Sequence, residues 1–100
     1  MNTLSAYKKE IHELCATHNV KSLYAFGSVL TSNFNSNSDI DLIVDFKDLE
    51  IANYAENYFD LKTSLQNTFK RNVDLLEFHS LKNPYFKQAL DKTKVLVYEE

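Results

Sequence analysis

The segment that most constrains the fold runs from residue 39 to residue 46, where apolar and acidic side chains alternate. The apolar positions are Ile40, Leu42, Val44 and Phe46, and the positions between and before them are Asp39, Asp41, Ile43 and Asp45. Neighbouring residues of a β-strand point to opposite faces of the sheet, so this pattern predicts a strand with one apolar and one largely acidic face. We therefore expect a β-sheet with carboxylates grouped on one of its faces.

Helical and strand patterns alternate along the rest of the chain. The further elements expected are helices over residues 3–18, 49–69 and 84–91, and strands over residues 21–26, 73–78 and 95–98. Asn83 and Pro84 suit the start of the last helix, since asparagine caps a helix and proline is favoured at its first position. This order predicts an α/β or α+β fold with helices packed on one small mixed β-sheet, in a single domain over residues 1–100.

Composition narrows the class of protein further. No apolar run approaches the ~20 residues that span a membrane, and the N-terminus lacks the apolar stretch of a signal peptide. Cys15 is the only cysteine, which excludes an intrachain disulfide and thiol-based zinc sites. A protein of the reducing cytoplasm, with no membrane contact, is therefore expected.

The distribution of charge argues against general nucleic-acid binding. The net charge is -3, the lysines are scattered, and Arg71 is the only arginine, whereas nucleic-acid binders usually carry a basic stripe. A nucleotide is still an acceptable ligand, because metal ions can neutralise its phosphates.

Gly27 is the only glycine in the chain, although average usage would give about seven in 100 residues. Glycine lets the backbone turn with positive φ and lets a ligand approach the backbone closely. Here it follows a predicted strand and precedes Ser28, a hydroxyl donor. A strand followed by Gly-Ser and a helical turn is a geometry that binds phosphate, so Gly27 and Ser28 are candidate nucleotide-binding residues.

Three aspartates form the candidate catalytic and metal-binding set. Ten residues separate Ser28 from Asp39, and Asp41 lies two positions further on, so the two carboxylates share a strand face. Like charges placed in this way raise each other's pKa unless a cation lies between them. Asp74 begins the next strand and completes the set if that strand is a neighbour. Oxygen ligands of this kind suit Mg²⁺ or Mn²⁺.

These residues resemble the signature of the DNA polymerase beta superfamily of nucleotidyltransferases, and the stretch GSVLTSNFNSNSDIDLIV carries the likeness. The length and element order resemble its smallest members, the minimal nucleotidyltransferases (MNT) encoded beside a helical HEPN partner. The resemblance implies the polymerase beta-like nucleotidyltransferase fold. It also implies two Mg²⁺ or Mn²⁺ ions, both held by Asp39 and Asp41 and one of them by Asp74. Gly27 and Ser28 would then hold the phosphates of ATP or another nucleoside triphosphate.

The sequence departs from the family pattern at one point. Small family members usually read Gly-Ser-x-Ala-Arg-Gly, whereas this chain has Thr31 and Ser32 in place of the arginine and second glycine. Other acidic and histidine residues are assigned to the surface or to ordinary packing. Glu77 is left out of the site because it lies on the strand face opposite Asp74, and Asp45 and Asp48 are taken as surface acids.

Three functions follow from this reading. The first is an enzyme that transfers a nucleoside monophosphate, AMP from ATP, to a hydroxyl; the resemblance suggests a tyrosine of a HEPN toxin, which would make this chain an antitoxin. The second is a non-catalytic module that neutralises its partner by contact. The third is a small-molecule transferase of the aminoglycoside type. The residues leave the acceptor, the base and any homo-oligomer open.

Overall fold

A computed structural model describes residues 2–31, 35, 37–47 and 52–100. Its elements, in chain order, are α1 (Asn2–Ser5), α2 (Lys8–Thr17), β1 (Val20–Phe26), the 3₁₀ turn η1 (Gly27–Leu30), β2 (Ile40–Phe46), α3 (Tyr54–Phe69), β3 (Val73–Glu77), the 3₁₀ turn η2 (Phe78–Ser80), α4 (Pro84–Thr93) and β4 (Val95–Glu99). Helices and strands therefore follow the order that the sequence predicts.

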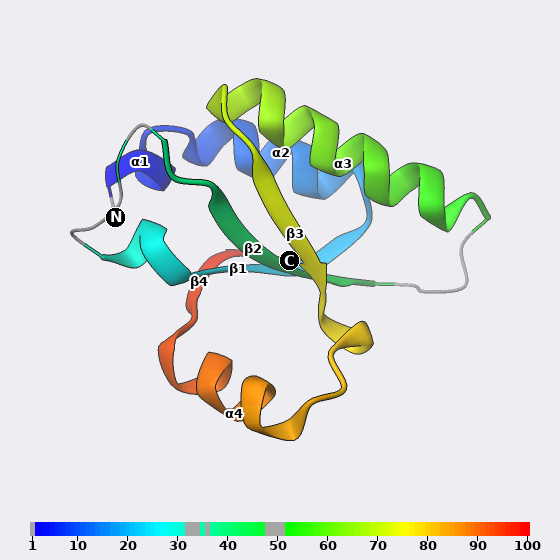
Figure 1. The fold of residues 1–100 in the computed structure, drawn as a ribbon. Helices are drawn as coiled ribbons and strands as arrows, with labels where there is room; N and C mark the ends of the chain where they lie inside the picture. The colour runs from blue at the N-terminus through cyan, green and yellow to red at the C-terminus, as the bar shows by residue number, and fades with distance from the viewer. Residues whose placement is uncertain (1, 32–34, 36, 48–51) are drawn as a thin grey trace.

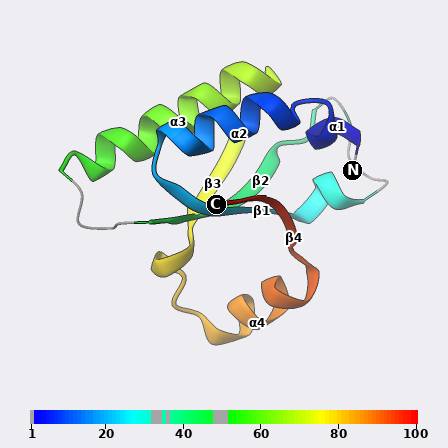
Figure 2. The same ribbon diagram turned by 180° about the vertical axis from the view of Figure 1, so that it is seen from behind.

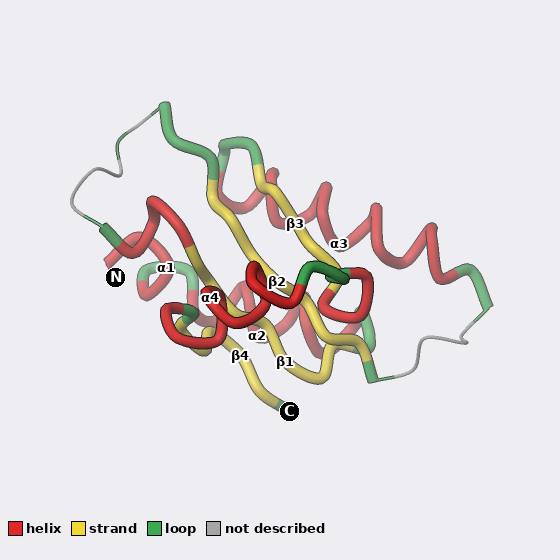
Figure 3. Tube along the Cα trace, turned by 60° about the horizontal axis from the view of Figure 1, so that its bottom comes forward, coloured by secondary structure: helices red, strands yellow, loops and turns green. Residues whose placement is uncertain are grey.

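The strands form one four-stranded sheet in the order β3-β2-β1-β4. The β2–β3 pair is parallel, whereas β1 runs antiparallel to both β2 and β4, so the sheet is mixed. Helices α2 and α3 cover one face, and α4 lies on the other (Figures 1 and 2). Figure 3, seen from the α4 side, shows α4 crossing in front of the central strands. The predicted fold, a small mixed sheet packed with helices, is confirmed.

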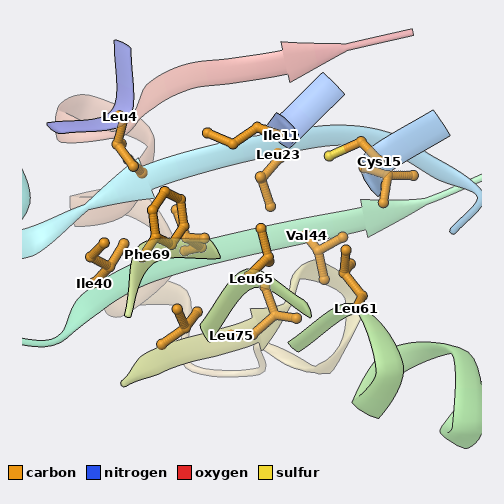
Figure 4. Close-up of a cluster of buried hydrophobic side chains, with 14 of the residues drawn as sticks. Leu4, Ile11, Cys15, Leu23, Ile40, Val44, Leu61, Leu65, Phe69 and Leu75 are labelled. Carbon is orange, nitrogen blue, oxygen red and sulfur yellow. The ribbon is translucent and has the colours of Figure 1, made fainter. Parts of the chain in front are cut away.

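The hydrophobic core fills the space between the sheet and the α2–α3 layer (Figure 4). The apolar face of β2 supplies Ile40, Leu42, Val44 and Phe46, all buried as the alternating pattern predicts. Leu61 and Leu65 of α3 pack onto these residues and are fully buried. Burial of this kind contributes roughly 25 cal/mol per Å² of apolar surface. The core therefore fixes which face β2 turns away from the helices, and that face carries the aspartates.

Two helix boundaries differ from the sequence prediction. The expected helix over residues 3–18 is divided, because the chain turns at Tyr7, whose N–H donates to the Leu4 carbonyl at 3.1 Å and whose ring packs edge-on against Phe69. The expected helix over residues 49–69 begins at Tyr54, after Asn53 adopts a left-handed conformation with φ 63°. Residues 49–51 of that prediction lie outside the described residues.

The last helix begins where the sequence predicts. The Asn83 side chain accepts hydrogen bonds from the N–H groups of Tyr85 (2.9 Å) and Phe86 (3.2 Å), and Pro84 occupies the first turn. The side-chain cap satisfies two of the N–H groups that a helix start leaves without intrahelical partners. The helix continues to Thr93, two residues beyond the predicted end.

Strand β3 is an edge strand, and α3 protects it. The Val73 N–H donates to Oε1 of Gln66 at 3.2 Å, and the Tyr58 hydroxyl donates to the Leu75 carbonyl. Both backbone groups point away from β2, and an open edge of this kind would otherwise offer itself to a foreign strand. Side chains of α3 thus occupy part of the free edge. Across the described residues, no helix is long and apolar enough to span a membrane.

The single thiol gives a direct test of the core. Cys15 is fully buried, and this burial raises the pKa of its thiol to about 12. Because the thiolate is the reactive form, the native protein should resist alkylation by iodoacetamide at mildly alkaline pH, while the protein in denaturant should react rapidly. Mass spectrometry of both samples measures the difference. Rapid alkylation of the native protein would contradict the placement of Cys15.

The same thiol should make stability depend on pH. The unfolded thiol has its ordinary pKa of 9.0, so between pH 9.0 and about 12 the unfolded chain loses a proton that the folded chain keeps. The free energy of unfolding should therefore fall as the pH rises through this window, by up to about 1.4 kcal/mol per pH unit from this group. Urea titrations of the wild type and Cys15→Ala should show a shallower fall for the variant. Equal slopes would contradict the assignment.

Candidate functional site

Three segments that are distant in the sequence meet at one end of the sheet. Strand β1 ends there, while β2 and β3 begin there. Phe26, the last residue of β1, pairs with Asp41 of β2, and Asp41 pairs in turn with Asp74 of β3. The sequence prediction that the Asp74 strand neighbours the Asp41 strand is therefore confirmed.

Asp41 and Asp74 point to the same side of the sheet. They are register partners on parallel strands, and both lie on the face opposite the α2–α3 core. Asp74 is exposed and Asp41 is half-buried. Burial raises the pKa of the Asp41 carboxyl above its usual range, and the charges of Asp74 and then Asp39 raise this pKa further. Asp39, directly before β2, is thus close enough to act on Asp41.

Gly27 lies against the side chain of Asp41. Its φ is +76°, a conformation that residues with a Cβ rarely adopt. A Cβ at this position would stand 2.6 Å from Oδ2 of Asp41, closer than van der Waals contact allows. The sequence predicted a positive φ and a close approach at this glycine. The group that approaches in this structure is the chain's own carboxylate.

Ser28 follows in η1, the helical turn that the sequence predicts after the Gly-Ser pair. The structure describes the backbone of Ser28 but not its side chain, so its predicted phosphate contact lies outside the described part of the chain. Ser32, the second departure from the family pattern, also lies outside the described residues.

Arg71 is a site residue that the sequence prediction missed. One nitrogen of its guanidinium, Nη1, donates to the carbonyl oxygens of Asn35 and Ser38, each at 3.0 Å. Ser38 immediately precedes Asp39, so Arg71 ties the loop that carries Asp39 to the start of β3. One signal was available in the sequence: the only arginine of the chain stands three residues before Asp74.

The chemistry of the three aspartates fits a hard divalent cation. All the donors are carboxylate oxygens, which Mg²⁺ and Mn²⁺ prefer. Among the described residues, no three Asp, Glu, His or Cys side chains already stand close enough together to hold an ion. Like-charged carboxylates lower their energy by moving apart, and the charges of Asp74 and Asp39 add to the effect of burial in raising the pKa of Asp41. A cation among them would turn this repulsion into attraction.

Asp45 and Glu77 lie away from this end of the sheet. Asp45 shares a face with Asp41 but lies near the far end of β2, where its Oδ1 is 3.1 Å from Nε2 of His79. Glu77 lies on the opposite face from Asp74, as the sequence predicts, and pairs in register with Val44. Asp48 lies outside the described residues. The structure therefore pairs Asp41 with Asp74, places Asp39 near enough for its charge to act on Asp41, and separates Asp45 and Glu77 from them.

Comparison with known sequences assigns the family. The model of the family described as polymerase beta, nucleotidyltransferase matches residues 9–100. A protein of Methanocaldococcus jannaschii named as a protein adenylyltransferase is 31% identical over 97% of this chain and 100% of its own length. The protein adenylyltransferase MntA of Thermococcus cleftensis is 32% identical over 87% of this chain and 82% of its own length.

Solved structures show the same fold. A minimal nucleotidyltransferase superposes with a TM-score of 0.77 and 26% identity, covering 94% of this chain and 92% of that one. A toxin–antitoxin crystal structure with AMP-PNP gives a TM-score of 0.72 at 22% identity, covering 93% and 73% of the two chains. A complex of a tri-AMPylated Shewanella oneidensis HEPN toxin with its MNT antitoxin gives 0.66 at 20% identity, covering 97% and 73%.

The family match extends over nearly the whole chain, and it includes the glycine bend, Asp39 and Asp41 at the start of β2, and Asp74 of β3. The chain belongs to the polymerase beta nucleotidyltransferase family and, like its relatives named as protein adenylyltransferases, is a nucleotidyltransferase.

Proposed function

We propose that this nucleotidyltransferase moves AMP from ATP to a hydroxyl group, and that the acceptor is a tyrosine of a HEPN-type protein partner. One observation supports the proposal above the others. Asp41 and Asp74 are register partners on parallel strands, and Asp41 also lies against the Gly27 backbone. The bend that would receive the phosphates and the carboxylates that would hold cations thus form one continuous surface.

The aspartates would hold two divalent ions, with Mg²⁺ the first choice and Mn²⁺ the alternative. Asp39 and Asp41 would contact both ions, and Asp74 one of them. When bound, such ions stabilise the charge on the entering and leaving oxygens of a phosphoryl transfer.

The chain's own residues divide the remaining tasks. Gly27 has no side chain, which keeps the bend beside Asp41 clear and lets a phosphate approach the backbone. Ser28 would donate a hydrogen bond to a phosphate oxygen. Asp74 is the more exposed carboxylate, so it is placed to take the proton of an incoming hydroxyl, a contribution of typically ~10²–10⁴-fold. Arg71 would keep the Asp39 loop in position.

A separate protein is the acceptor that the relatives favour. The solved structure of an AMPylated HEPN toxin bound to an MNT antitoxin contains both the product and the partner of such a reaction. Thr31 stands where small family members usually have arginine, so a cation that would neutralise the nucleotide phosphates is absent at this position. With ATP as donor, we place the reaction in the cytoplasm.

Transfer of labelled AMP tests the proposal. The protein is incubated with [α-³²P]ATP, Mg²⁺ and the protein encoded by the neighbouring gene, and label on that protein is measured. Asp41→Asn and Asp74→Asn should each lower the transfer by more than about 100-fold. Loss of a residue that only orients a metal ligand lowers activity by about 10- to 100-fold, and these aspartates would bind the metal directly. Asp45→Asn is the matched control, because Asp45 lies on the same strand and face but outside the site. It should transfer at the wild-type rate.

Each other outcome of this assay selects a different function. Neutralisation of the partner with no label on it would support the contact-only module. Label on an aminoglycoside, with none on protein, would support the small-molecule transferase. Equal transfer by Asp41→Asn and the wild type would contradict the site itself.

The contact between Gly27 and Asp41 predicts coupled stabilities. Gly27→Ala should destabilise the fold for two reasons: a left-handed conformation costs about 1–2 kcal/mol for a residue with a Cβ, and the new methyl meets the Asp41 carboxylate. In an Asp41→Ala background only the first cost should remain. Urea titrations of the two single variants and the double variant measure this coupling. Strictly additive effects would show that the two residues do not touch.

Arg71 should act on metal affinity through the Asp39 loop. We expect Arg71→Ala to raise the Kd for Mn²⁺, measured by electron paramagnetic resonance, by about 10-fold, as for other residues that orient a metal ligand. The Kd of Arg71→Lys should lie between those of the wild type and Arg71→Ala, since an ammonium group still donates hydrogen bonds. Lys70→Ala removes the same charge from the neighbouring position and should leave the Kd unchanged. An equal change in Kd for Arg71→Ala and Lys70→Ala would contradict this role, because it would show that only the loss of a positive charge matters.

A further inference from the structure

A pocket lies at the free edge of the sheet, between α3 and the end of β3. Its volume is about 440 Å³, and its lining includes Tyr54, Tyr58, Phe59, Leu75, Leu76 and Glu77. The lining comes from the helix and the strand of a single αβ unit. None of the aspartates of the candidate site lines this pocket.

Glu77 has an unsatisfied oxygen at this pocket. Its Oε1 is buried, and no described residue donates a hydrogen bond to it. Some carboxylates elsewhere have cationic or imidazole partners, as Asp91 has Lys94 and Asp60 has His18. A buried acceptor without a donor is unfavourable, and native proteins keep few of them. Oε1 of Glu77 therefore has no donor among the described residues, and a donor would have to come from another molecule.

The walls of the pocket are aromatic and held in place. The Tyr54 ring packs edge-on against Phe46 at 5.4 Å, and the Tyr58 ring packs in the same way against Phe59 at 5.1 Å. Phe59 is 60% exposed, so much of its ring is open to solvent beside the pocket. Burial, followed by the charges of Glu77 and Tyr58, raises the pKa of Tyr54 to about 12, so this wall stays neutral and the carboxylate supplies the local negative charge.

We propose that this pocket docks a partner protein through an arginine or lysine side chain, whose cationic head donates to Glu77 and whose flanking apolar residue covers Phe59. The charge of Glu77 selects a cation. Aromatic faces attract cations and accept the aliphatic stem that carries one. Aromatic residues are enriched at protein interfaces, and arginine is among the residues that contribute most of the binding energy there.

The structure favours side-chain insertion over strand addition at this edge. The Leu75 carbonyl already accepts from Tyr58, and the Val73 N–H already donates to Gln66. A peptide that extended the sheet would have to break both hydrogen bonds. A single side chain that enters from the partner leaves them intact.

A peptide probe tests the proposal without metal, nucleotide or the natural partner. The ¹⁵N-labelled protein is titrated with acetyl-Leu-Arg-Leu-amide, and amide shifts are followed by NMR. We expect the largest shifts at Tyr58, Leu76 and Glu77. The same peptide with citrulline in place of arginine keeps the shape but not the charge, and should bind at least about tenfold more weakly, the loss expected for one charge-assisted hydrogen bond.

Variants separate docking from folding. Glu77→Gln should weaken binding of the arginine peptide by a similar factor while the protein melts no lower than the wild type, because the variant removes a buried unpaired charge. Glu56→Gln, a change at an exposed acid of α3 outside the pocket, is the control and should bind as the wild type does. Phe59→Ala changes an exposed side chain outside the hydrophobic core, and it should also weaken binding.

Three results would overturn the proposal. The first is equal binding of the arginine and citrulline peptides. The second is a set of shifts that maps away from α3 and β3. The third is binding of butylguanidine as tight as that of the peptide, which would make the pocket a small-molecule site. The transfer assay with the aspartate variants is a separate test, because Asp39, Asp41 and Asp74 do not line this pocket.

Discussion

The parallel pairing of β2 with β3 is the constraint on which the site depends. It sets Asp41 directly beside Asp74, and the antiparallel pairing of β1 with β2 brings Gly27 to the same place. Both pairings are fixed from the other side of the sheet, where Ile40 and Leu42 are buried under the helices. A shift of one residue in register would turn the aspartates into the core. The core therefore holds together carboxylates that would otherwise separate.

This arrangement places like charges close together at the end of the sheet, where they repel one another. Asp41 is partly buried beside two like charges, and its carboxyl has a raised pKa as a result. Gly27 permits this arrangement, because the absence of a Cβ leaves room for the Asp41 carboxylate against the backbone. Strain of this kind is typical of sites that are completed by a ligand. On the opposite strand face, Oε1 of Glu77 is also unfavourably placed, because it is buried without a hydrogen-bond donor among mainly apolar side chains.

Local patterns predict much of this structure, and long-range contacts account for what they miss. The alternation in residues 39–46 identifies β2 and its acidic face, and the lone glycine identifies the bend, because both are properties of a few consecutive residues. The division of the first helix at Tyr7 depends on packing against Phe69, which no local pattern contains. Arg71 was missed for the same reason, since its partners lie more than 30 residues earlier in the chain. The unsatisfied oxygen of Glu77 is likewise a property of the packed structure.

Anomalous diffraction from crystals grown with Mn²⁺ and a non-hydrolysable ATP analogue tests the central claim most directly. The account predicts a manganese peak within about 2.0–2.3 Å of carboxylate oxygens of both Asp41 and Asp74, with the analogue's phosphates beside Gly27. A nucleotide bound elsewhere, or manganese at the Asp45–His79 pair with none at Asp41 and Asp74, would contradict it.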